Sequence, residues 1–501
     1  MQQSRSKFGG VSMASPNVEI QYTKLFINNE FVDSVSGRKF ASINPVDETV
    51  VSEVAEGDKA DVDKAVAAAK NAFARGSEWR SLQPAQRSAL LNKLADLVEH
   101  HVKEIASIMT LENGKPFAHA MIETYGAAGV LRYYAGWCDK IHGQTIPTDD
   151  GSLVMTRKEP VGVAGQITPW NYPIILLAFK WGPALAAGCT IVLKPAEQTP
   201  LCNLYIAALT KEAGFPPGVV NVVPGFGPTA GAALAEHPDV AKIAFTGSVQ
   251  VGKLIMKASG NSNLKRVTLE LGGKSPLVIF DDVNVDEAVK KAHEAIFKNS
   301  GQICFAASRT YVHSKIYDEF VEKSKDLALK RKVGNPFDPA TEQGPQVEKE
   351  IFDRALKFIE IGKKEGAKLV TGGERVGNKG FFIQPTIFAD VTDEMTIARE
   401  EIFGPVQSIL KFESLEDVIN RANDTNYGLG AGVLTNDINK AIKFAQAVDS
   451  GNVWVNHYGV LTPSAPFGGF KQSGIGRELG SEALDNYLET KTISIKLSSD
   501  Y

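Results

Sequence analysis

The sequence has few of the residues that mark disulfide-stabilised or metal-binding proteins. Its 501 residues include only four cysteines, and no two of them form a Cys-x-x-Cys pair. A chain of this length can bury a sufficient core without disulfides, so this usage predicts a reduced, intracellular protein. The eight histidines show no metal-ligand spacing, because the pair in "EHHVK" (99–103) lies in an amphipathic run typical of a solvated helix face. No structural or catalytic metal is expected.

A surplus of charge of either sign is also missing. The chain has 54 basic and 58 acidic residues, and this balance predicts neither a nucleic-acid-binding surface nor an acidic disordered tail. The first 16 residues, "MQQSRSKFGGVSMASP", contain no apolar segment of the kind found in secretion signals, and they are short for a transit peptide. A cytoplasmic location is therefore expected.

The longest apolar run, "PIILLAFKWGPALAAGCTIVL" (173–193), is about as long as a membrane span. Lys180 interrupts this run, and Gly182, Pro183 and Gly188 break it. A buried helix followed by a buried strand accounts better for the composition. We therefore expect no association with a membrane.

Alternation of strand and helix organises the chain between residues 160 and 280. Strands that are apolar throughout and alternate with helices predict a parallel sheet covered on both faces, which is a doubly wound α/β domain. The predicted strands lie at 161–169, 190–195, 219–225, 242–247 and 267–273, and the predicted helices lie near 173–187, 199–213, 228–236 and 249–259.

A second α/β segment begins at "PLVIFDDVNVDEAVKK" (276–291) and continues to about residue 470. Two other segments, "GSLVMTRKEP" (151–160) and "TKTISIKL" (490–497), have strand character without a following helix. These two segments could pair with each other as an appended sheet between subunits.

Cys304 differs from the other cysteines in its surroundings. It follows the polar, Gly-containing segment "KNSGQI" (298–303) at the expected end of a helix. A flexible polar loop there would expose the thiol, and an exposed cysteine in suitable surroundings can act as a nucleophile. The alternative is an inert packing residue.

Glu270 and Asn171 are candidate partners of this thiol. Glu270 interrupts the apolar strand "VTLELGG" (267–273), and burial there would raise its pKa towards that of a general base. The alternative is a salt-bridged glutamate at the end of a strand. Asn171, in "TPWNYP" (168–173), could donate its amide to a developing oxyanion, or it could cap the helix that Pro173 begins.

Two Gly-rich segments, "FTGSVQVG" (245–252) and "GFGPTAG" (225–231), lie where turns are expected in this alternation. Backbone N–H groups and the helix dipole bind phosphate between a strand and a helix, although neither segment has the Gly-x-Gly-x-x-Gly spacing. Each segment is either a nucleotide-binding turn or a tight turn without a ligand.

The chain also carries seven motifs in a fixed order: "PWNYP", "LKPAEQTP", "FTGS", "LELGGKSP", "GQIC", "EEIFGPV" and "PFGGFKQSGIGRELG". Together they resemble the NAD(P)-dependent aldehyde dehydrogenase superfamily over nearly the whole chain, and most closely its animal class 1 and class 2 branches. The resemblance implies a Rossmann-like doubly wound dinucleotide-binding domain, a second α/β catalytic domain and a small β extension for oligomerisation. The implied boundaries are 1–138 and 161–270 for the NAD-binding domain, 271–472 for the catalytic domain, and 139–160 and 487–501 for the oligomerisation segments.

The resemblance assigns chemical roles to four residues. Cys304 is implied to be the nucleophile that attacks an aldehyde and forms first a thiohemiacetal and then a thioester. Asn171 and the backbone N–H of Cys304 are implied to hold the oxyanion. Glu270 is implied to be the base for the thiol or for the hydrolytic water, with Glu478 on the proton path.

The resemblance also implies a cofactor site. Lys194 and Glu197 match the pair that hydrogen-bonds the adenosine ribose, and a carboxylate there would repel a 2′-phosphate, so NAD is expected over NADP. The further implied cofactor contacts are Trp170 and Ser248 near the pyrophosphate, Glu401 on the nicotinamide ribose, Phe403 beside the ring, and Ile167 and Gly227.

Lys298 stands where relatives commonly place an aromatic residue in the substrate tunnel. It either meets a distant anionic or polar end of the substrate, or its stem follows the wall and its charge reaches water. Acetaldehyde, retinal, a terpenoid aldehyde and lipid-derived aldehydes all fit a mainly apolar tunnel. The other implied lining residues are Leu176, Phe179, Leu461 and Phe467.

The expected protein is an active enzyme acting on a small-molecule aldehyde, assembled as a homotetramer, with a dimer as the second expectation. Two alternatives remain open at this point. One is a lens-crystallin-like structural protein, derived from an aldehyde dehydrogenase, with weak or no activity. The other is a nucleotide-binding protein in which Cys304 is inert.

Overall fold

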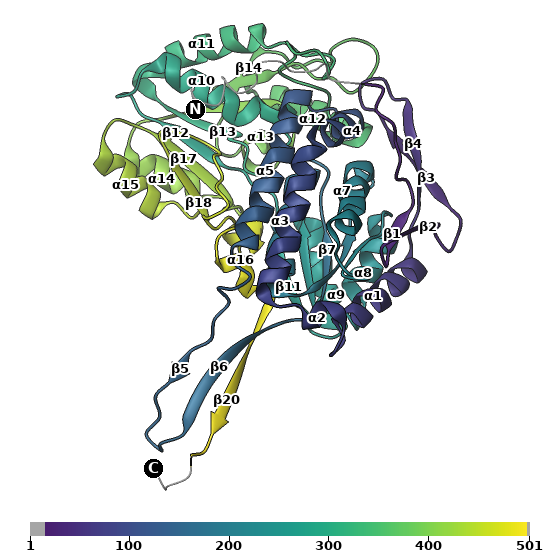
Figure 1. Cartoon of the computed structure of the whole chain (residues 1–501). Helices are drawn as coiled ribbons and strands as arrows, with labels where there is room; N and C mark the ends of the chain where they lie inside the picture. Colours follow the sequence, from purple (N-terminus) through teal and green to yellow (C-terminus); the bar gives the residue numbers. More distant parts are fainter. Residues whose placement is uncertain (1–15, 498–501) are drawn as a thin grey trace.

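The structure, a computed structural model, describes residues 16–497 (Figure 1). Two large sheets packed against helices form the body, and a narrow three-stranded sheet extends away from it. The N-terminal segment on which the cytoplasmic expectation depends lies outside the described residues, apart from its last residue. The last four residues of the predicted oligomerisation segment, 498–501, lie outside them as well.

The larger sheet has eight strands, and it contains the five strands that were predicted between residues 160 and 280. Those five are parallel to one another, while β1 and β19 flank them in the antiparallel direction. The predicted doubly wound domain is confirmed. The order of strands is β19 (Gly474–Ile475), β11 (Arg266–Glu270), β10 (Lys242–Thr246), β7 (Val163–Ile167), β8 (Thr190–Lys194), β9 (Val220–Val222), β1 (Leu25–Ile27) and β2 (Glu30–Val32).

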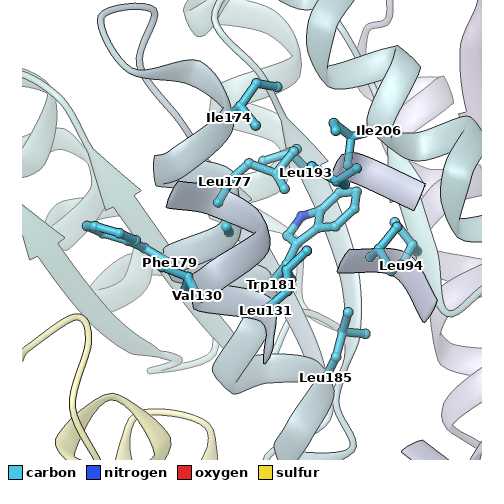
Figure 2. Packing of buried hydrophobic residues seen from close by; sticks show 14 of the residues in the cluster. Leu94, Val130, Leu131, Ile174, Leu177, Phe179, Trp181, Leu185, Leu193 and Ile206 are labelled. Atoms are coloured by element: carbon cyan, nitrogen blue, oxygen red, sulfur yellow. The ribbon is translucent and has the colours of Figure 1, made fainter. Parts of the chain in front are cut away.

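Helices cover both faces of this sheet, because its central strands are apolar on both sides. Figure 2 shows part of one layer, in which Trp181 lies among buried aliphatic side chains from neighbouring helices and from the sheet. One face packs against α3 (Pro84–His100), α4 (Val102–Asn113), α5 (Phe117–Ala135), α6 (Pro173–Ala187) and α7 (Pro200–Ala213), and the other packs against α1 (Lys59–Phe73), α8 (Ala232–Glu236) and α9 (Val249–Asn261).

Helix α6 and strand β8 account for the long apolar run at 173–193, as predicted. Pro173 occupies the first turn of α6, where its missing N–H removes no helix hydrogen bond. Gly188 ends the helix with a φ of 91°, a left-handed conformation that favours glycine. Within residues 16–497, no helix has the length and apolarity needed to cross a bilayer.

The second sheet has seven strands and forms the other half of the body. All its neighbouring strands are parallel except β14, which pairs antiparallel with β15. The order of strands is β14 (Lys368–Thr371), β15 (Thr386–Ala389), β16 (Val406–Phe412), β13 (Arg309–His313), β12 (Pro276–Ile279), β17 (Gly430–Leu434) and β18 (Asn452–Val455). The covering helices are α10 (Val285–Phe297) and α11 (Tyr317–Lys330) on one face, and α12 (Lys349–Lys364), α13 (Thr396–Arg399), α14 (Leu415–Asn423) and α15 (Ile438–Ala447) on the other.

The two segments with isolated strand character pair with each other, as expected. Strand β6 (Leu153–Pro160) runs antiparallel to β20 (Leu488–Ile495) along its whole length, and β5 (Thr145–Ile146) adds to the other edge of β6. This three-stranded sheet projects from the body in Figure 1. The shorter elements are a hairpin of β3 (Lys39–Ile43) and β4 (Val50–Ala55), the helices α2 (Glu78–Ser81) and α16 (Glu482–Asp485), and a π-helical turn at Gly227–Gly231.

The fold gathers the predicted chemical residues at one edge of the larger sheet. The loops that follow β7, β8 and β10 contain Asn171, Glu197 and Ser248, and Glu270 is the last residue of β11. Because the carboxyl ends of parallel strands lie at the same edge, these side chains come together although they are far apart in the sequence.

Candidate active site

Two adjoining cavities lie at this edge of the sheet. The longer cavity has a volume of about 670 Å³, and the shorter one has a volume of about 200 Å³. Trp170, Thr246 and Ser248 line both of them, so the two cavities meet at these side chains.

The longer cavity collects the residues predicted for the adenosine ribose and the pyrophosphate of a dinucleotide, together with Ile167 and Gly227. Lys194 is buried and donates a hydrogen bond from Nζ to Glu197 at 2.7 Å. Ser248 precedes α9 and accepts a hydrogen bond from the backbone N–H of Val251 at 3.3 Å. The predicted residues on this cavity wall are Ile167, Trp170, Lys194, Glu197, Gly227 and Ser248.

These walls fit a dinucleotide. Leu254 and Ile255 of α9 provide apolar surface for a base. The paired side chains of Lys194 and Glu197 offer a donor and an acceptor to a ribose, and a helix N-terminus such as that of α9 favours a phosphate.

The shorter cavity collects the predicted chemical residues and the predicted nicotinamide contacts. Asn171, Glu270, Cys304, Glu401 and Phe403 all line it. The structure therefore brings together every predicted site residue except Glu478 within two adjoining cavities.

Glu401 reaches this cavity because Gly272 has no side chain. The Glu401 carboxylate accepts a hydrogen bond from the backbone N–H of Gly273 at 3.1 Å. A Cβ atom on Gly272 would lie 2.3 Å from Glu401 Oε2, so a larger residue there would displace the carboxylate. Burial raises the pKa of Glu401 to about 7.

Phe403 adopts an uncommon backbone conformation beside Glu401. Its φ of 63° is left-handed, which costs free energy for a bulky residue and is concentrated at functional sites. The ring packs edge-to-face against Trp170, with centroids 5.3 Å apart. This contact places an aromatic wall where the two cavities meet.

Cys304 is the one described cysteine that is not classed as a fully buried residue. Cys138, Cys189 and Cys202 are buried, whereas Cys304 lines the shorter cavity. The alternative of an inert packing residue is therefore disfavoured. Burial and the adjacent Glu270 carboxyl hold the pKa of the Cys304 thiol well above its ordinary value, so the thiol needs a base when it reacts.

The segment before Cys304 is not the flexible polar loop that was expected from its composition. Asn299, Ser300 and Gly301 have φ values of 51°, 59° and 75°, three left-handed residues in a row. All three are buried, and Ser300 Oγ donates to the backbone oxygen of Gly344 at 2.9 Å. Gln302 also accepts a hydrogen bond from the backbone N–H of Val347 at 3.0 Å. The expectation of flexibility was wrong because tertiary hydrogen bonds fix these polar side chains.

Glu270 is 2% exposed; its carboxyl lies beside the Cys304 thiol, and no N–H or O–H donor among the described residues reaches either of its oxygens. The alternative of a salt-bridged glutamate is therefore not supported. Burial, followed by the negative charge of Glu478, raises the pKa of Glu270 to about 8. A carboxyl with that pKa can both accept and return a proton near neutral pH.

Asn171 does not cap the helix that follows it. Its Nδ2 donates to the backbone oxygen of Gln302 at 3.1 Å, on the segment that leads to Cys304. The side-chain amide has two N–H groups, so one remains for an atom in the cavity.

Glu478 lies outside both cavities but is coupled to them. It forms an ion pair with the buried Lys180, which also donates to Thr246 Oγ1 at 2.6 Å. Thr246 lines the cavities and pairs in register with Glu270 in the sheet. A continuous set of polar groups therefore connects Glu478 with the cavity wall.

Arg354 is a cavity residue that the sequence did not indicate. It comes from α12, on the other half of the body, and donates to the backbone oxygen of Glu401 at 2.6 Å. It lies in an ordinary amphipathic helix with no motif, so only the packing of the two halves could reveal it.

Lys298 is exposed at the end of α10. Its charge acts on His119 of α5 and, together with burial, which is the larger effect, lowers the pKa of His119 to about 4. The predicted apolar lining residues belong to one packed cluster with Cys304: Leu176, Phe179 and Phe467 are buried in it, and Leu461 is half-buried against it. The predicted apolar residues therefore belong to the same core against which Cys304 packs, and Lys298 stays on the surface.

Metal binding was not expected. Within residues 16–497, no three His, Cys, Asp or Glu side chains are grouped so that they could hold a metal ion. The lack of a metal remains a prediction.

Comparison with known proteins places this fold and site. The family model described as the aldehyde dehydrogenase family matches residues 31–493. Aldehyde dehydrogenase 1A1 of Rattus norvegicus is 58% identical over 483 residues, covering 96% of this chain and 96% of the relative. Retinaldehyde dehydrogenase 3 of Homo sapiens is 58% identical over 482 residues, covering 96% of this chain and 94% of the relative. The solved NAD+ complex of aldehyde dehydrogenase from Bacillus cereus has a TM-score of 0.94 at 51% identity, covering 95% of this chain and 97% of that one.

Two adjoining cavities at the carboxyl edge of a parallel sheet, one of them lined by a cysteine and a buried carboxyl, are the arrangement expected of a nucleotide-dependent oxidoreductase with a cysteine nucleophile. The chain belongs to the aldehyde dehydrogenase family. The predicted fold class and enzyme class are confirmed, as is the resemblance to the animal class 1 enzymes. No observation on the described residues favours the crystallin alternative.

Proposed function

We propose that Cys304, Glu270 and Asn171 carry out the oxidation of an aldehyde to its carboxylic acid in this chain. The observation that supports the proposal is their meeting in one cavity, where the buried Glu270 carboxyl faces the Cys304 thiol and accepts no N–H or O–H group of the described residues. The reaction itself, NAD-dependent oxidation of an aldehyde, is that of the family to which the chain belongs.

The first step adds the thiol to the aldehyde. Cys304 Sγ forms a bond with the carbonyl carbon, and its proton passes to Glu270, whose raised pKa suits it to act as a base near neutral pH. The carbonyl oxygen becomes an oxyanion as its π bond breaks. The free N–H of the Asn171 amide and the backbone N–H of Cys304 would stabilise that charge.

NAD, when bound, supplies the acceptor for the hydride that leaves the thiohemiacetal carbon, and a thioester on Cys304 results. Glu270 then passes the thiol proton on towards solvent and, once ionised again, takes a proton from water, whose oxygen attacks the thioester carbon. The carbon–sulfur bond breaks, the carboxylic acid leaves and the thiol is restored with the returned proton. Glu478 and Lys180 are proposed to accept or relay protons from Glu270.

The dinucleotide is proposed to occupy the longer cavity with its nicotinamide end in the shorter one. Lys194 and Glu197 would hydrogen-bond the adenosine ribose, and Ser248 and Trp170 would face the pyrophosphate. Glu401 and Phe403 would contact the nicotinamide half, with Ile167 and Gly227 on the wall of the longer cavity. Glu197 at the ribose favours NAD over NADP, because its charge would repel a 2′-phosphate.

Assembly, location and substrate are proposed from sequence similarity. We propose a homotetramer, in which the sheet formed by segments 139–160 and 487–501 contacts a neighbouring subunit, and a cytoplasmic location. The NAD-binding and catalytic domains are proposed to span 1–138 with 161–270, and 271–472. The substrate class is an aldehyde with an extended apolar body, because the relatives include a retinaldehyde dehydrogenase and the thiol lies against an apolar cluster.

The test of this proposal is NADH formation at 340 nm with a panel of aldehydes that includes acetaldehyde, retinal, a terpenoid aldehyde and a lipid-peroxidation aldehyde. Turnover of at least one of them, with the carboxylic acid as product, is expected. Folded protein that turns over none of them would contradict the proposal and favour the crystallin alternative.

A further inference from the structure

The structure assigns a further role to a buried ion pair behind the cavity. We propose that Lys115 and Glu123 position Asn171 to receive the oxyanion, a role that rests on the proposed function of Asn171. Neither side chain lines the two cavities, so both would act through another residue.

Lys115 holds the backbone of Asn171 directly. The Lys115 side chain is buried, and its Nζ donates one hydrogen bond to the backbone oxygen of Asn171 at 2.8 Å and another to a carboxylate oxygen of Glu123. The ammonium also lies 4.2 Å from the centre of the Tyr172 ring, a favourable cation–π contact. Lys115 therefore contacts two consecutive residues of the segment that leads to α6.

Glu123 holds the other side of the same segment. Its second carboxylate oxygen accepts the backbone N–H of Ile174 at 2.9 Å and that of Ile175 at 3.2 Å. These donors belong to the first turn of α6, and the residue that precedes the helix, Tyr172, provides no side-chain cap. Glu123, from α5, therefore supplies the missing cap from outside the helix.

Two asparagines complete the support of this segment. Asn113 donates to the backbone oxygen of Trp170 at 2.8 Å, and Asn299 donates to that of Asn171 at 3.1 Å. The backbone from Trp170 to Ile175 is thus fixed on both sides of Asn171.

Fixing the backbone fixes the direction of the Asn171 amide. An oxyanion donor is effective only if it already points to the place where the charge develops, and small displacements reduce the rate strongly. Because Lys115, in the turn before α5, pairs with Glu123 of α5, both sides of the segment are tied to one ion pair. Buried charges are tolerated only when they are paired in this way. Removing one partner would leave the other charge buried and unpaired, at the full free-energy cost of its desolvation.

The experiment compares the neutral double variant Lys115→Met/Glu123→Gln in the native and the Asn171→Ala background. The measured step is acylation of Cys304 by 4-nitrophenyl acetate in the absence of NAD. The release of 4-nitrophenolate, the leaving group of this step, gives its rate. We expect the double variant to slow acylation about 10-fold or more in the native background. In the Asn171→Ala background we expect a further loss of less than about 2-fold, because the two effects act through one group.

Glu112→Gln is the matched control. Glu112 lies on the neighbouring helix α4, is fully buried, and accepts the first-turn N–H groups of Leu201 and Cys202 in α7. It has the same capping role as Glu123 but does not touch the segment that contains Asn171. We expect acylation at the native rate in this control and a dissociation constant for NAD within about 2-fold of native in all variants.

An equal loss in both backgrounds would show general damage and overturn the inference, as would an unchanged rate in the double variant. If the double variant does not fold, Glu123→Gln alone gives the same comparison, with an expected loss of about 3- to 10-fold confined to the native background. Failure of the proposed function is separable. Acylation at the native rate in Asn171→Ala or Cys304→Ala would refute the roles of those residues whatever the ion pair does.

Discussion

Two regions of this molecule bury glutamates to a similar extent but differ in the hydrogen bonds that the carboxyl groups accept. In the helix pair α4 and α5, Glu112 and Glu123 are 0% and 4% exposed, and each accepts two backbone N–H groups. At the end of β11, Glu270 is 2% exposed, lies beside the Cys304 thiol and accepts no N–H or O–H group of the described residues. An unsatisfied buried carboxyl costs free energy that the fold could have avoided. The difference indicates that the helix-pair carboxyls hold backbone in place and that Glu270 is kept free for a proton.

The largest expected effect distinguishes the two regions by their cysteines. Cys304→Ala, in the cavity that Glu270 of β11 also lines, should reduce dehydrogenase activity by about 1000-fold or more, because no other group can form the thioester. NAD binding should remain within a few-fold of native, since the dinucleotide walls come from other segments. Cys202 lies in α7 and contacts Glu112 of α4. Cys202→Ala is the matched control and should retain activity. Substantial dehydrogenation by Cys304→Ala would refute the assignment.

The second effect concerns the base. Glu270→Gln should lower turnover at neutral pH by about 100-fold or more, the range of general-base catalysis. In the native enzyme the rate should rise with pH and level off above about 8, because Glu270 must lose its proton to act as a base. This rise of the rate with pH should be absent from the residual activity of Glu270→Gln. An unchanged rate, or an unchanged dependence of the rate on pH, in the variant would show that another residue is the base.

The third effect compares stability. Burial raises the pKa of Glu270 to about 8, so its stabilising contribution is full below the ordinary carboxyl pKa and is lost as pH rises through 8. Glu270→Gln should therefore exceed the native protein in stability at pH 9, by on the order of a few kcal/mol. Glu112→Gln should instead lose about 1–2 kcal/mol at neutral pH, because one backbone N–H loses its acceptor. Chemical unfolding of both variants at each pH measures the contrast, and equal destabilisation in the two regions would contradict it.

The smallest effect is expected at Lys298, on the surface near the helix pair. Lys298→Phe should change kcat/KM for neutral aldehydes by less than about 5-fold, because an exposed ammonium is well solvated. Aldehydes with a terminal carboxylate should show no larger change than neutral ones of equal length. A loss of more than about 10-fold confined to the carboxylate series would favour the alternative, in which Lys298 recognises an anionic end.

The strands and helices of the larger sheet could be predicted closely, because their periods and capping residues are local. Strand 242–247 and helix 173–187, for example, were expected within a residue or two of where they lie. Cys304, Glu270 and Asn171 could be selected because each interrupts its local pattern with a reactive or polar group. The rigidity of residues 299–302 was missed, because its cause is hydrogen bonding to residues more than 40 positions away.

The sequence by itself determined the α/β architecture and the family, and it selected the candidate reacting groups, since these depend on periodicity and on motifs within short segments. Only the tertiary structure decided that Glu270 accepts no N–H group while Glu112 and Glu123 accept two backbone N–H groups each. The burial of a residue can be anticipated from the sequence, but its hydrogen-bond partners cannot. It also decided that Lys115, Glu123 and Arg354 surround the site. Their positions follow from packing α5 against α6 and α12 against the second sheet, and no pattern within one helix specifies its neighbour's contacts.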